Sequence, residues 1–301
     1  DDFLTAGINR LSLGAQSFSD DILLSIGRNH SRYQLIESCE WIREALEDGR
    51  IISWSLDLIQ NLPSQTLVDW KNQIFEAIKS SAPHLSIYDL SIEPGTVFDG
   101  KNRRGELKLP NEKLAIEINR LTNNLLLEVG MTRYEISSYS LPCHASRHNR
   151  MYWSGSGWWG FGMSATSAPW GTRFSRPKTI KDYREWVINQ EIEGIDESLL
   201  ASNAKKMSLD ELLMTGLRTR EGVNLESLSK SWGWTKLERR KYLTSLEGFW
   251  KESIANGLIE RQGERFHLTD PEGMEISNQI LVQMILWWES LPQSAVAQPN
   301  I

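Results

Sequence analysis

The chain has 301 residues, of which 40% are hydrophobic and 24% charged, with a formal net charge of −6 and two cysteines. This composition is ordinary for a soluble globular protein and excludes disordered, collagen-like and disulfide-rich chains. The length suits one large domain or a large and a small one. The negative charge argues against a nucleic-acid-binding protein, which needs a basic face. Two cysteines are too few for a four-cysteine zinc site or a complete iron–sulfur ligand set.

Neither a membrane span nor a secretory signal is expected. No apolar run reaches the roughly 18 residues that a membrane helix needs, and the longest candidate, 280–288, is shorter than that. No secretory apolar segment opens the sequence, and the few cysteines give no reason to expect an oxidising compartment, so we expect a cytoplasmic protein. The sequence begins at Asp1 rather than with methionine. We therefore expect a fragment or processed product of a longer protein, or a degenerate short form.

The first 136 residues alternate short β-branched runs with amphipathic stretches. Capping boxes at Ser31/Gln34 and Thr66/Asp69 predict where two of the helices begin. The strands are predicted at 8–13, 51–59, 84–92 and 133–136, and the main helices at 31–47, 66–80 and 114–130. This order predicts an α/β fold of parallel strands with crossover helices. Four strands are too few for a closed eight-stranded barrel, so the sheet is open or strands precede Asp1.

After residue 136 the pattern changes. Residues 137–168 are rich in Gly, Ser, Trp and His, and the sequence becomes helical again from about Ser208. Helices are predicted at 209–217, 225–232 and 237–256, followed by a hairpin at 258–269 that turns at Gln262-Gly263. Three helices and a hairpin predict a winged-helix-like domain. Residues 292–301 are interpreted as a loose tail.

Three polar residues, Gln16, Arg28 and Asp57, come at or just beyond the end of a predicted strand or early helix. Asp57 is the most informative, because an acid inside an apolar parallel strand must be paired or face a cavity. A structural Asp bonded to neighbouring amides is equally compatible with the pattern. In a barrel, however, polar groups at the carboxyl ends of strands line the ligand site.

Residues 147–153 place an imidazole, an amide, guanidinium groups and two aromatic rings in one predicted loop. A neutral imidazole can ligate haem iron, and aromatic rings can stack on a flat macrocycle. Taken alone, His148 is more simply interpreted as a loop anchor bonded to the backbone. A metal site of Cys143, His144 and His148 is conceivable but incomplete.

Two further features have a simple structural interpretation. The glycines between 155 and 162 surround Trp158 and Trp159, but they do not match a nucleotide-binding spacing, and a strand with tight corners explains them. Residues 201–301 contain 12 Lys+Arg against 13 Asp+Glu, so the winged-helix-like domain gives little support for DNA binding. We interpret His30, His84 and His267 as ordinary structural histidines.

Several collinear segments together resemble the radical S-adenosylmethionine (SAM) haem chaperones, relatives of oxygen-independent coproporphyrinogen III oxidase. The resemblance covers about residues 7–285. The matching segments are 7–12, 14–18, 27–30, 57–59 with 62–63, 65–66, 92–96, 134–137, 147–149 and 152–153. It implies that the first domain is a partial radical-SAM (β/α) barrel, followed by an α-rich, winged-helix-like C-terminal domain.

The resemblance also implies two groups of binding residues. Polar residues of the oxidase branch that contact a second SAM correspond to Gln16, Arg28, Asp57 and, by offset, Ser91. The chaperone branch has a motif associated with haem handling, which corresponds to His148, Asn149, Tyr152 and Trp153. The implied cofactors are therefore haem and SAM, together with the 4Fe–4S cluster of full-length relatives.

The departures from the family concern the chemistry of the cluster. The family's C-x3-C-x2-C motif lies upstream of the strand that opens this chain, and Cys39 and Cys143 do not replace it. We therefore assign no catalytic residue and no metal ligand. Gln60-Asn61 replaces the usual Tyr-Gly pair, although Asn61 tolerates the left-handed backbone of the turn. Residues 163–166 lack a family histidine, so haem contacts near Thr166 are not expected.

The resemblance predicts a protein that binds haem or a porphyrin and delivers haem to an acceptor protein, without nucleic acid as a partner. The alternative is an enzyme resembling coproporphyrinogen III oxidase, and a plain interaction or DNA-binding module is a third reading. The sequence does not decide between the chaperone and the enzyme. It also leaves open the oligomeric state and the acceptor protein. The predicted domains are 1–200 for the partial barrel and the His/Trp/Gly-rich extension, 201–290 for the winged-helix-like domain, and 291–301 for the tail.

Overall fold

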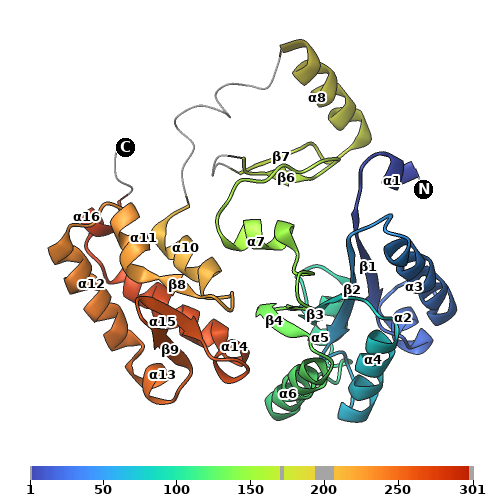
Figure 1. Ribbon diagram of the computed structural model, residues 1–301, viewed down its shortest axis with the longest axis horizontal. Coiled ribbons are helices and arrows are strands. Elements are labelled where there is room, and N and C mark those ends of the chain that lie inside the picture. Colours follow the sequence, from blue (N-terminus) through green and yellow to red (C-terminus); the bar gives the residue numbers. More distant parts are fainter. Residues whose placement is uncertain (1, 170–172, 194–206, 298–301) are drawn as a thin grey trace. The chain divides into compact units, whose positions relative to one another are not determined.

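The structure, a computed structural model, describes residues 2–169, 173–193 and 207–297 (Figure 1). It divides into two compact units, 1–145 and 146–301, which are treated separately below. The described residues between 146 and 193 thus group with the C-terminal unit rather than with the sheet. The domain limits of 1–200, 201–290 and 291–301 remain a prediction about independently folding parts.

The N-terminal unit contains a five-stranded mixed sheet. Its strands are β1 (Arg10–Gln16), β2 (Ser53–Gln60), β3 (His84–Asp89), β4 (Thr132–Glu135) and β5 (Ser138–Ser140). The order in the sheet is β1-β2-β3-β5-β4. β1, β2 and β3 are parallel, as predicted, while β5 is antiparallel to both β3 and β4. The first three strands therefore bring their carboxyl ends to one edge of the sheet.

The predicted four-stranded sheet is wrong in one respect, because the segment after residue 136 returns as β5. The Ile87 amide donates to the carbonyl of Ser137 at 2.7 Å, and Leu85 then pairs with Tyr139. β5 has only three residues, too few for an alternation pattern to be recognised. This hairpin separates β4 from β3, so β4 lies at the sheet edge.

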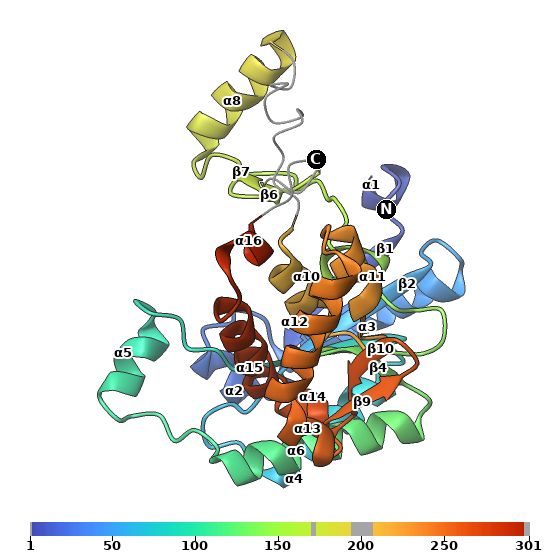
Figure 2. The ribbon, with the colours of Figure 1, turned by 90° about the vertical axis from the view of Figure 1, so that its left-hand side faces the viewer.

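The helices of the N-terminal unit are α1 (Asp2–Thr5), α2 (Asp20–Ser25), α3 (Arg32–Glu47), α4 (Leu67–Lys79), α5 (Val97–Arg103) and α6 (Glu112–Glu128). Both predicted capping boxes are present, at the starts of α3 and α4. Gly49, with φ +69°, ends α3 as a left-handed residue beyond its C-cap. α5 lies at the end of a long connection, away from the sheet (Figure 2).

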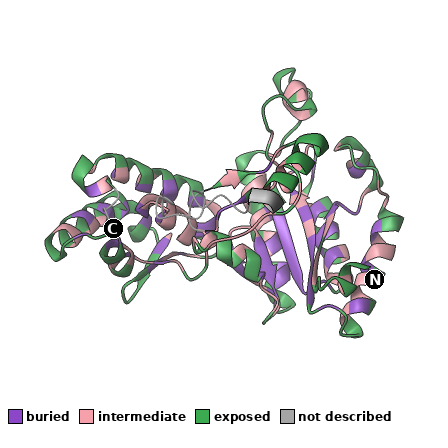
Figure 3. Cartoon of the chain, turned by 90° about the horizontal axis from the view of Figure 1, so that it is seen from above, coloured by how far each residue is buried: buried purple, intermediate pink, exposed green. Residues whose placement is uncertain are grey.

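One face of the sheet forms the hydrophobic core with α3, α4 and α6. Alternate strand residues reach this core, and the central strands are almost wholly buried (Figure 3). The strand contributions are Leu11, Leu13, Ala15, Trp54, Leu56, Leu58, Leu85, Ile87 and Tyr139. Since successive side chains of a strand alternate, the residues between these face the other side of the sheet.

The C-terminal unit begins with α7 (Arg147–Trp153), the short hairpin of β6 (Thr166–Ser167) and β7 (Phe174–Ser175), and α8 (Ile180–Glu193). A winged-helix arrangement follows, as predicted. Its helices are α10 (Leu209–Gly216), α11 (Leu225–Ser231), α12 (Lys236–Phe249), α13 (Lys251–Ala255), α14 (Glu272–Glu275), α15 (Ser277–Glu289) and α16 (Gln293–Val296). Its three-stranded sheet has the order β8 (Val223–Asn224), β10 (Arg265–Leu268), β9 (Ile259–Gln262).

Two predictions for this unit need correction. The single helix predicted at 237–256 is divided at Trp250, whose side chain is fully buried. The tail predicted at 291–301 is packed over its first half, because the Ala295 carbonyl accepts hydrogen bonds from the indoles of Trp232 and Trp234 at 3.1 and 3.0 Å. The rest of the tail, 298–301, lies outside the described residues. Within the described ranges, none of the helices combines the length and hydrophobicity of a membrane-spanning segment.

Candidate functional site

The sheet face opposite the hydrophobic core is polar across all three parallel strands. Ser12 and Gly14 of β1 pair in register with Ser55 and Asp57 of β2. These in turn pair with His84 and Ser86 of β3. A parallel sheet normally has apolar residues on both faces. A polar face at this position is therefore a candidate binding surface.

Asp57 is held by two serine hydroxyl groups. Ser12 Oγ donates to Asp57 Oδ2 at 2.7 Å, and Ser55 Oγ donates to Oδ1 at 3.0 Å. The sequence left open whether Asp57 is bonded to backbone amides, and the structure instead shows serine side chains from β1 and β2. Each carboxylate oxygen keeps a lone pair for a further donor. The half-buried carboxylate is thus fixed in place and still able to accept from a ligand.

A chain of hydrogen bonds continues from Asp57 to β4. Ser55 Oγ lies 2.8 Å from His84 Nδ1, and His84 Nε2 lies 2.9 Å from the Tyr134 hydroxyl. Because a carboxylate only accepts, Ser55 donates its single proton to Asp57 and must accept from His84 Nδ1–H. A neutral His84 then accepts at Nε2 from Tyr134. Tyr134, His84, Ser55 and Asp57 form a directional relay, called the relay below.

His84 is neutral at physiological pH. Burial is the largest cause that lowers its pKa, to about 3, and the electrostatic influence of Arg10 and then of His144 lowers it further. Burial also raises the pKa of Glu135 on β4, against opposing hydrogen bonds from Ser138 and the Ser137 amide. His84 is a structural histidine, as predicted, and in addition it links β3 and β4 to Asp57 on β2.

Gln16 lies on the same polar face as Asp57. A bulge follows Gly14, and Gln16 takes a left-handed φ of +65°. A Cβ added at Gly14 would come 2.8 Å from Gln16 Nε2, so the amide occupies the space where a residue-14 side chain would lie. Gly14 pairs with Asp57 in register. The structure therefore brings Gln16 and Asp57 together, and Gly14 makes room for this.

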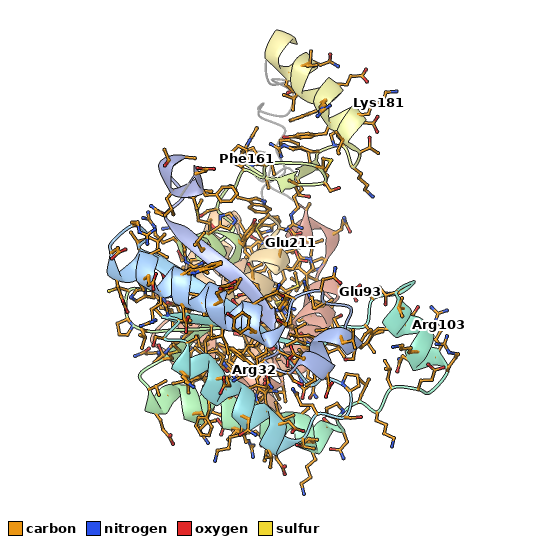
Figure 4. The ribbon with its side chains drawn as sticks, turned by 90° about the vertical axis from the view of Figure 1, so that its right-hand side faces the viewer. Arg32, Glu93, Arg103, Phe161, Lys181 and Glu211 are labelled. Atoms are coloured by element: carbon orange, nitrogen blue, oxygen red, sulfur yellow. The ribbon has the colours of Figure 1, made fainter. Side chains whose placement is uncertain are left out.

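Arg28 and Ser91 are placed differently. Arg28 is exposed in the loop after α2, whose His30 Nε2 lies 3.3 Å from the carbonyl of Ala15 at the end of β1. Ser91 is exposed beyond β3, where its hydroxyl donates to Glu93, a residue labelled in Figure 4. Both follow the carboxyl ends of parallel strands. Neither makes a direct hydrogen bond to Gln16 or Asp57 within the described part of the chain.

A second polar cluster at this edge was missed by the sequence reasoning. Gln60 Nε2 and Asn61 Nδ2 both donate to Asp89 Oδ1, at 2.9 and 2.6 Å, and Gln60 also donates to Asn119 at 2.6 Å. Asn61 has φ +59°, which confirms that it tolerates the left-handed turn. Gln60 meets Asp89 through the register of β2 and β3, which the sequence alone does not reveal.

In the C-terminal unit, residues 147–153 form a helix rather than the predicted loop. Ser146 caps α7 by accepting from the Asn149 amide at 3.3 Å. On the exposed side of α7, His148 Nε2 lies 2.9 Å from the Tyr152 hydroxyl, with the two rings edge to face at 4.7 Å. This is the i, i+4 spacing of one helix face. His148 is therefore bonded to a side chain, not to the backbone.

The rings continue from α7 onto the Gly-rich segment. Tyr152 packs on Trp158 with ring centroids 4.6 Å apart, and Arg173 stacks over Trp158 at 5.8 Å. We call His148, Tyr152, Trp158 and Arg173 the aromatic ladder. Asn149 and Trp153 are half-buried on the same helix. The ladder gathers an imidazole, two aromatic faces and a guanidinium.

The glycines of this segment serve close packing, although the predicted strand is reduced to a single bridge between Trp158 and Ala168. A Cβ at Gly157 would lie 2.1 Å from the Pro169 carbonyl oxygen, and one at Gly160 would lie 2.5 Å from that of Thr166. Side chains at these positions would push the strands apart. These glycines therefore allow the segment that carries Trp158 to pack closely against 166–169.

The described residues do not fit a metal or iron–sulfur site. Among them, no three His, Cys, Asp or Glu side chains gather to hold a metal ion. His144 Nδ1 is bonded to Ser53 Oγ at 3.0 Å, and Cys39 is buried in the core. Burial, and then the charge of Glu40, raise the pKa of the Cys39 thiol to about 11, whereas a cluster ligand must be a thiolate.

Comparison with known proteins gives consistent relatives. The chain is 38% identical over 292 residues to a Synechocystis protein named haem chaperone HemW, covering 91% of this chain and 68% of that protein. It is 31% identical to the HemW of Bacillus subtilis, covering 91% and 69%. No family model matches the sequence. The chain thus spans about two thirds of the length of these relatives.

A solved structure shares the fold. Coproporphyrinogen III oxidase (HemN) from Escherichia coli, described as a radical SAM enzyme, superimposes with a TM-score of 0.68 at 18% identity, covering 94% of this chain and 65% of that one. At this identity the similarity concerns the fold alone. It supports the mixed α/β sheet with parallel strands, followed by the α-rich C-terminal part.

Proposed function

The chain belongs to the HemW family of haem chaperones, and from this premise we propose that it binds haem through His148 and passes it to an acceptor protein. The observation that supports this best is the aromatic ladder. An imidazole can ligate haem iron, and aromatic rings can pack against the macrocycle. Asn149, Tyr152 and Trp153, all on α7 with His148, complete the proposed haem site.

The exposure of the ladder suits a carrier better than a permanent haem pocket. His148 is exposed, and Tyr152 keeps 39% of its surface accessible. Phe161, labelled in Figure 4, lies in the connection between Trp158 and β6 and is 82% exposed. A haem bound here would cover apolar surface that is otherwise in water. It would also stay accessible to an acceptor.

Tyr152 has a specific part in this proposal. Its hydroxyl holds His148 Nε2 at 2.9 Å and so orients the imidazole on the helix. Iron would take the place of this hydrogen bond when Nε2 becomes the ligand. Because the bond is single and exposed, it costs little to exchange for the iron. The site can therefore load and release haem without unfolding α7.

We place SAM binding on the polar face of the N-terminal unit. Gln16 and Asp57 lie together there, while Arg28 lies in the loop after α2 and Ser91 follows β3. Asp57 can accept from an ammonium or hydroxyl group, and Arg28 can bind a carboxylate. Full-length radical SAM relatives use SAM with a 4Fe–4S cluster, and the described residues do not fit that cluster. We therefore propose no step that depends on it.

The other expectations are retained as proposals. We place the protein in the cytoplasm, since two cysteines suit a reducing compartment. We also keep the domain limits of 1–200, 201–290 and 291–301. Coproporphyrinogen oxidation has no separate support, because the likeness to that enzyme concerns the fold alone.

Titration with haemin tests the proposed function. We expect His148→Ala to weaken binding at least about tenfold, the loss typical of removing even an outer-shell partner of a metal, and to shift the Soret band. His267→Ala is the matched control, since His267 lies in the β10 hairpin of the same unit, 3.5 Å from Glu260. Equal affinities and spectra for the wild type and His148→Ala would contradict the proposal.

A further inference from the structure

The hairpin of β6 and β7 presents two different faces. Thr166 pairs with Ser175 and Ser167 pairs with Phe174, while Trp158 bridges to Ala168. Trp158 and Trp159 contact different arginines of the hairpin and so belong to different sides of it. Each tryptophan has an arginine stacked on it: Arg173 on Trp158 and Arg176 on Trp159.

The side of the hairpin that carries Arg176 is covered by other residues of the C-terminal unit. Arg176 is buried, with only 4% of its surface exposed, and its guanidinium lies 5.1 Å from Trp159, 5.2 Å from Trp186 and 5.8 Å from Phe174. Its Nη1 donates to Ser167 Oγ at 2.7 Å. This arginine joins the hairpin to α8. It is a structural residue and has no access for a large ligand.

The face of Arg173 is open and continuous with the proposed haem site. Arg173 is exposed and stacks on Trp158, which contacts Tyr152, which in turn contacts His148. On α7, Arg150 is already paired with Glu221 at 2.8 Å. Within the described part of the chain, no carboxylate forms an ion pair with Arg173. A free guanidinium thus stands at the end of the ladder opposite the imidazole.

We propose that Arg173 binds a carboxylate side chain of the tetrapyrrole whose iron is ligated by His148. This deepens the proposed function and rests on it. The order along the ladder, from imidazole through two aromatic rings to guanidinium, corresponds to the order of groups in haem, from central iron through conjugated ring to carboxylates at the rim. The planar guanidinium forms two parallel hydrogen bonds to a carboxylate while it stacks on an aromatic face.

The ligand class follows from this geometry. The site would favour an iron tetrapyrrole with free carboxylates, because a porphyrin without them gives Arg173 no partner. The stacked position on Trp158 reduces the freedom that Arg173 loses on binding. The contribution of Arg173 is moderate rather than large, since the exposed guanidinium is partly screened by water.

Titration with two probes tests the inference. Haemin has free carboxylates, whereas haemin dimethyl ester has the same iron and ring without them. We expect Arg173→Ala to weaken haemin binding about fivefold and leave binding of the dimethyl ester unchanged, as an exposed but charge-assisted pair predicts. Arg173→Lys is expected to restore part of the affinity for haemin. Arg184→Ala, on the exposed side of α8, is the matched control and should change neither probe.

The outcomes separate this inference from the proposed function. If Arg173→Ala binds both probes as the wild type does, while His148→Ala weakens both, the carboxylate subsite is wrong and the haem site stands. If the wild type binds neither probe, or if His148→Ala is unchanged, the proposed function itself is wrong. Equal losses of both probes in Arg173→Ala would also overturn the inference, because they would indicate a general effect on the hairpin.

Discussion

Asp57 and His148 are both proposed to contact ligands, yet they lie in opposite surroundings. Asp57 is half-buried on the polar sheet face, where the hydroxyls of Ser12 and Ser55 already hold it. His148 is exposed on a short helix and has one hydrogen bond, to Tyr152. The first arrangement is preorganised and costly to disturb, whereas the second is open and adapts easily. This contrast fits a site that keeps its cofactor and a site that releases its cargo.

Acid is expected to have the largest effect on the buried side of this comparison. The pKa of His84 is lowered to about 3 in the folded chain. Below about pH 6.5 the unfolded chain therefore binds a proton at this histidine, whereas the folded chain does not. The stability of the sheet therefore falls as the pH drops from 6.5 towards 3, by about 1.4 kcal/mol per pH unit from this group. Glu135, whose pKa is raised, acts in the opposite direction.

Hydrogen exchange of peptides from β2 and β3, measured between pH 7 and 4, checks this expectation. In His84→Gln the pH slope should be shallower by about the contribution of one histidine. The slopes are compared rather than the absolute free energies of unfolding. An unchanged slope would mean that His84 titrates normally and that the relay is not closed to water.

The two tyrosine–histidine pairs allow a matched test of intermediate size. Both have an oxygen-to-Nε2 distance of 2.9 Å, but Tyr134 is buried and Tyr152 exposed. Tyr134→Phe should cost about 1–3 kcal/mol, because it leaves a buried imidazole nitrogen without a donor. Tyr152→Phe should change stability by less than about 0.5 kcal/mol, since water replaces the hydroxyl.

Urea unfolding of the two variants measures this difference. Equal costs for the two substitutions would remove the contrast between the sites. In particular, a cost below about 0.5 kcal/mol for Tyr134→Phe would show that the buried face is accessible to water.

The smallest effect is expected at Gly14. A methyl group there would meet the Gln16 amide at 2.8 Å and displace it, while stability should change by less than about 1 kcal/mol. The side-chain amide resonance of Gln16 in an NMR spectrum should shift in Gly14→Ala. Gly248→Ala is the control, because nothing lies within 4 Å of a Cβ there. An unmoved resonance would place the Gln16 amide elsewhere.

The contrast between the two sites also explains what the sequence could predict. Local signals were sufficient for the capped helices α3 and α4, the three parallel strands and the Gln262-Gly263 hairpin. The relay was missed because Ser55, His84 and Tyr134 are far apart in the sequence and meet only through strand register. β5 was missed because three residues give no periodicity.

For the candidate site residues, too, the sequence predicted some features and missed others. Gln16 and Asp57 were expected together, and the structure places them on one face because the bulge at Gly14 turns Gln16 inward. Residues 147–153 were expected as a loop, because the capping effect of Ser146 on the helix was not recognised. The contact of Arg173 with Trp158 depends on the pairing of β6 with β7. Strands of two residues are too short to be predicted from the sequence.

Electron paramagnetic resonance of the ferric haem complex tests the central claim most directly. Protein labelled with 15N at histidine should show a hyperfine coupling of the iron to one imidazole nitrogen, and the coupling should disappear in His148→Ala while remaining in His267→Ala. A wild-type complex without this coupling, or one that keeps it in His148→Ala, would contradict the assignment of His148 as the haem ligand.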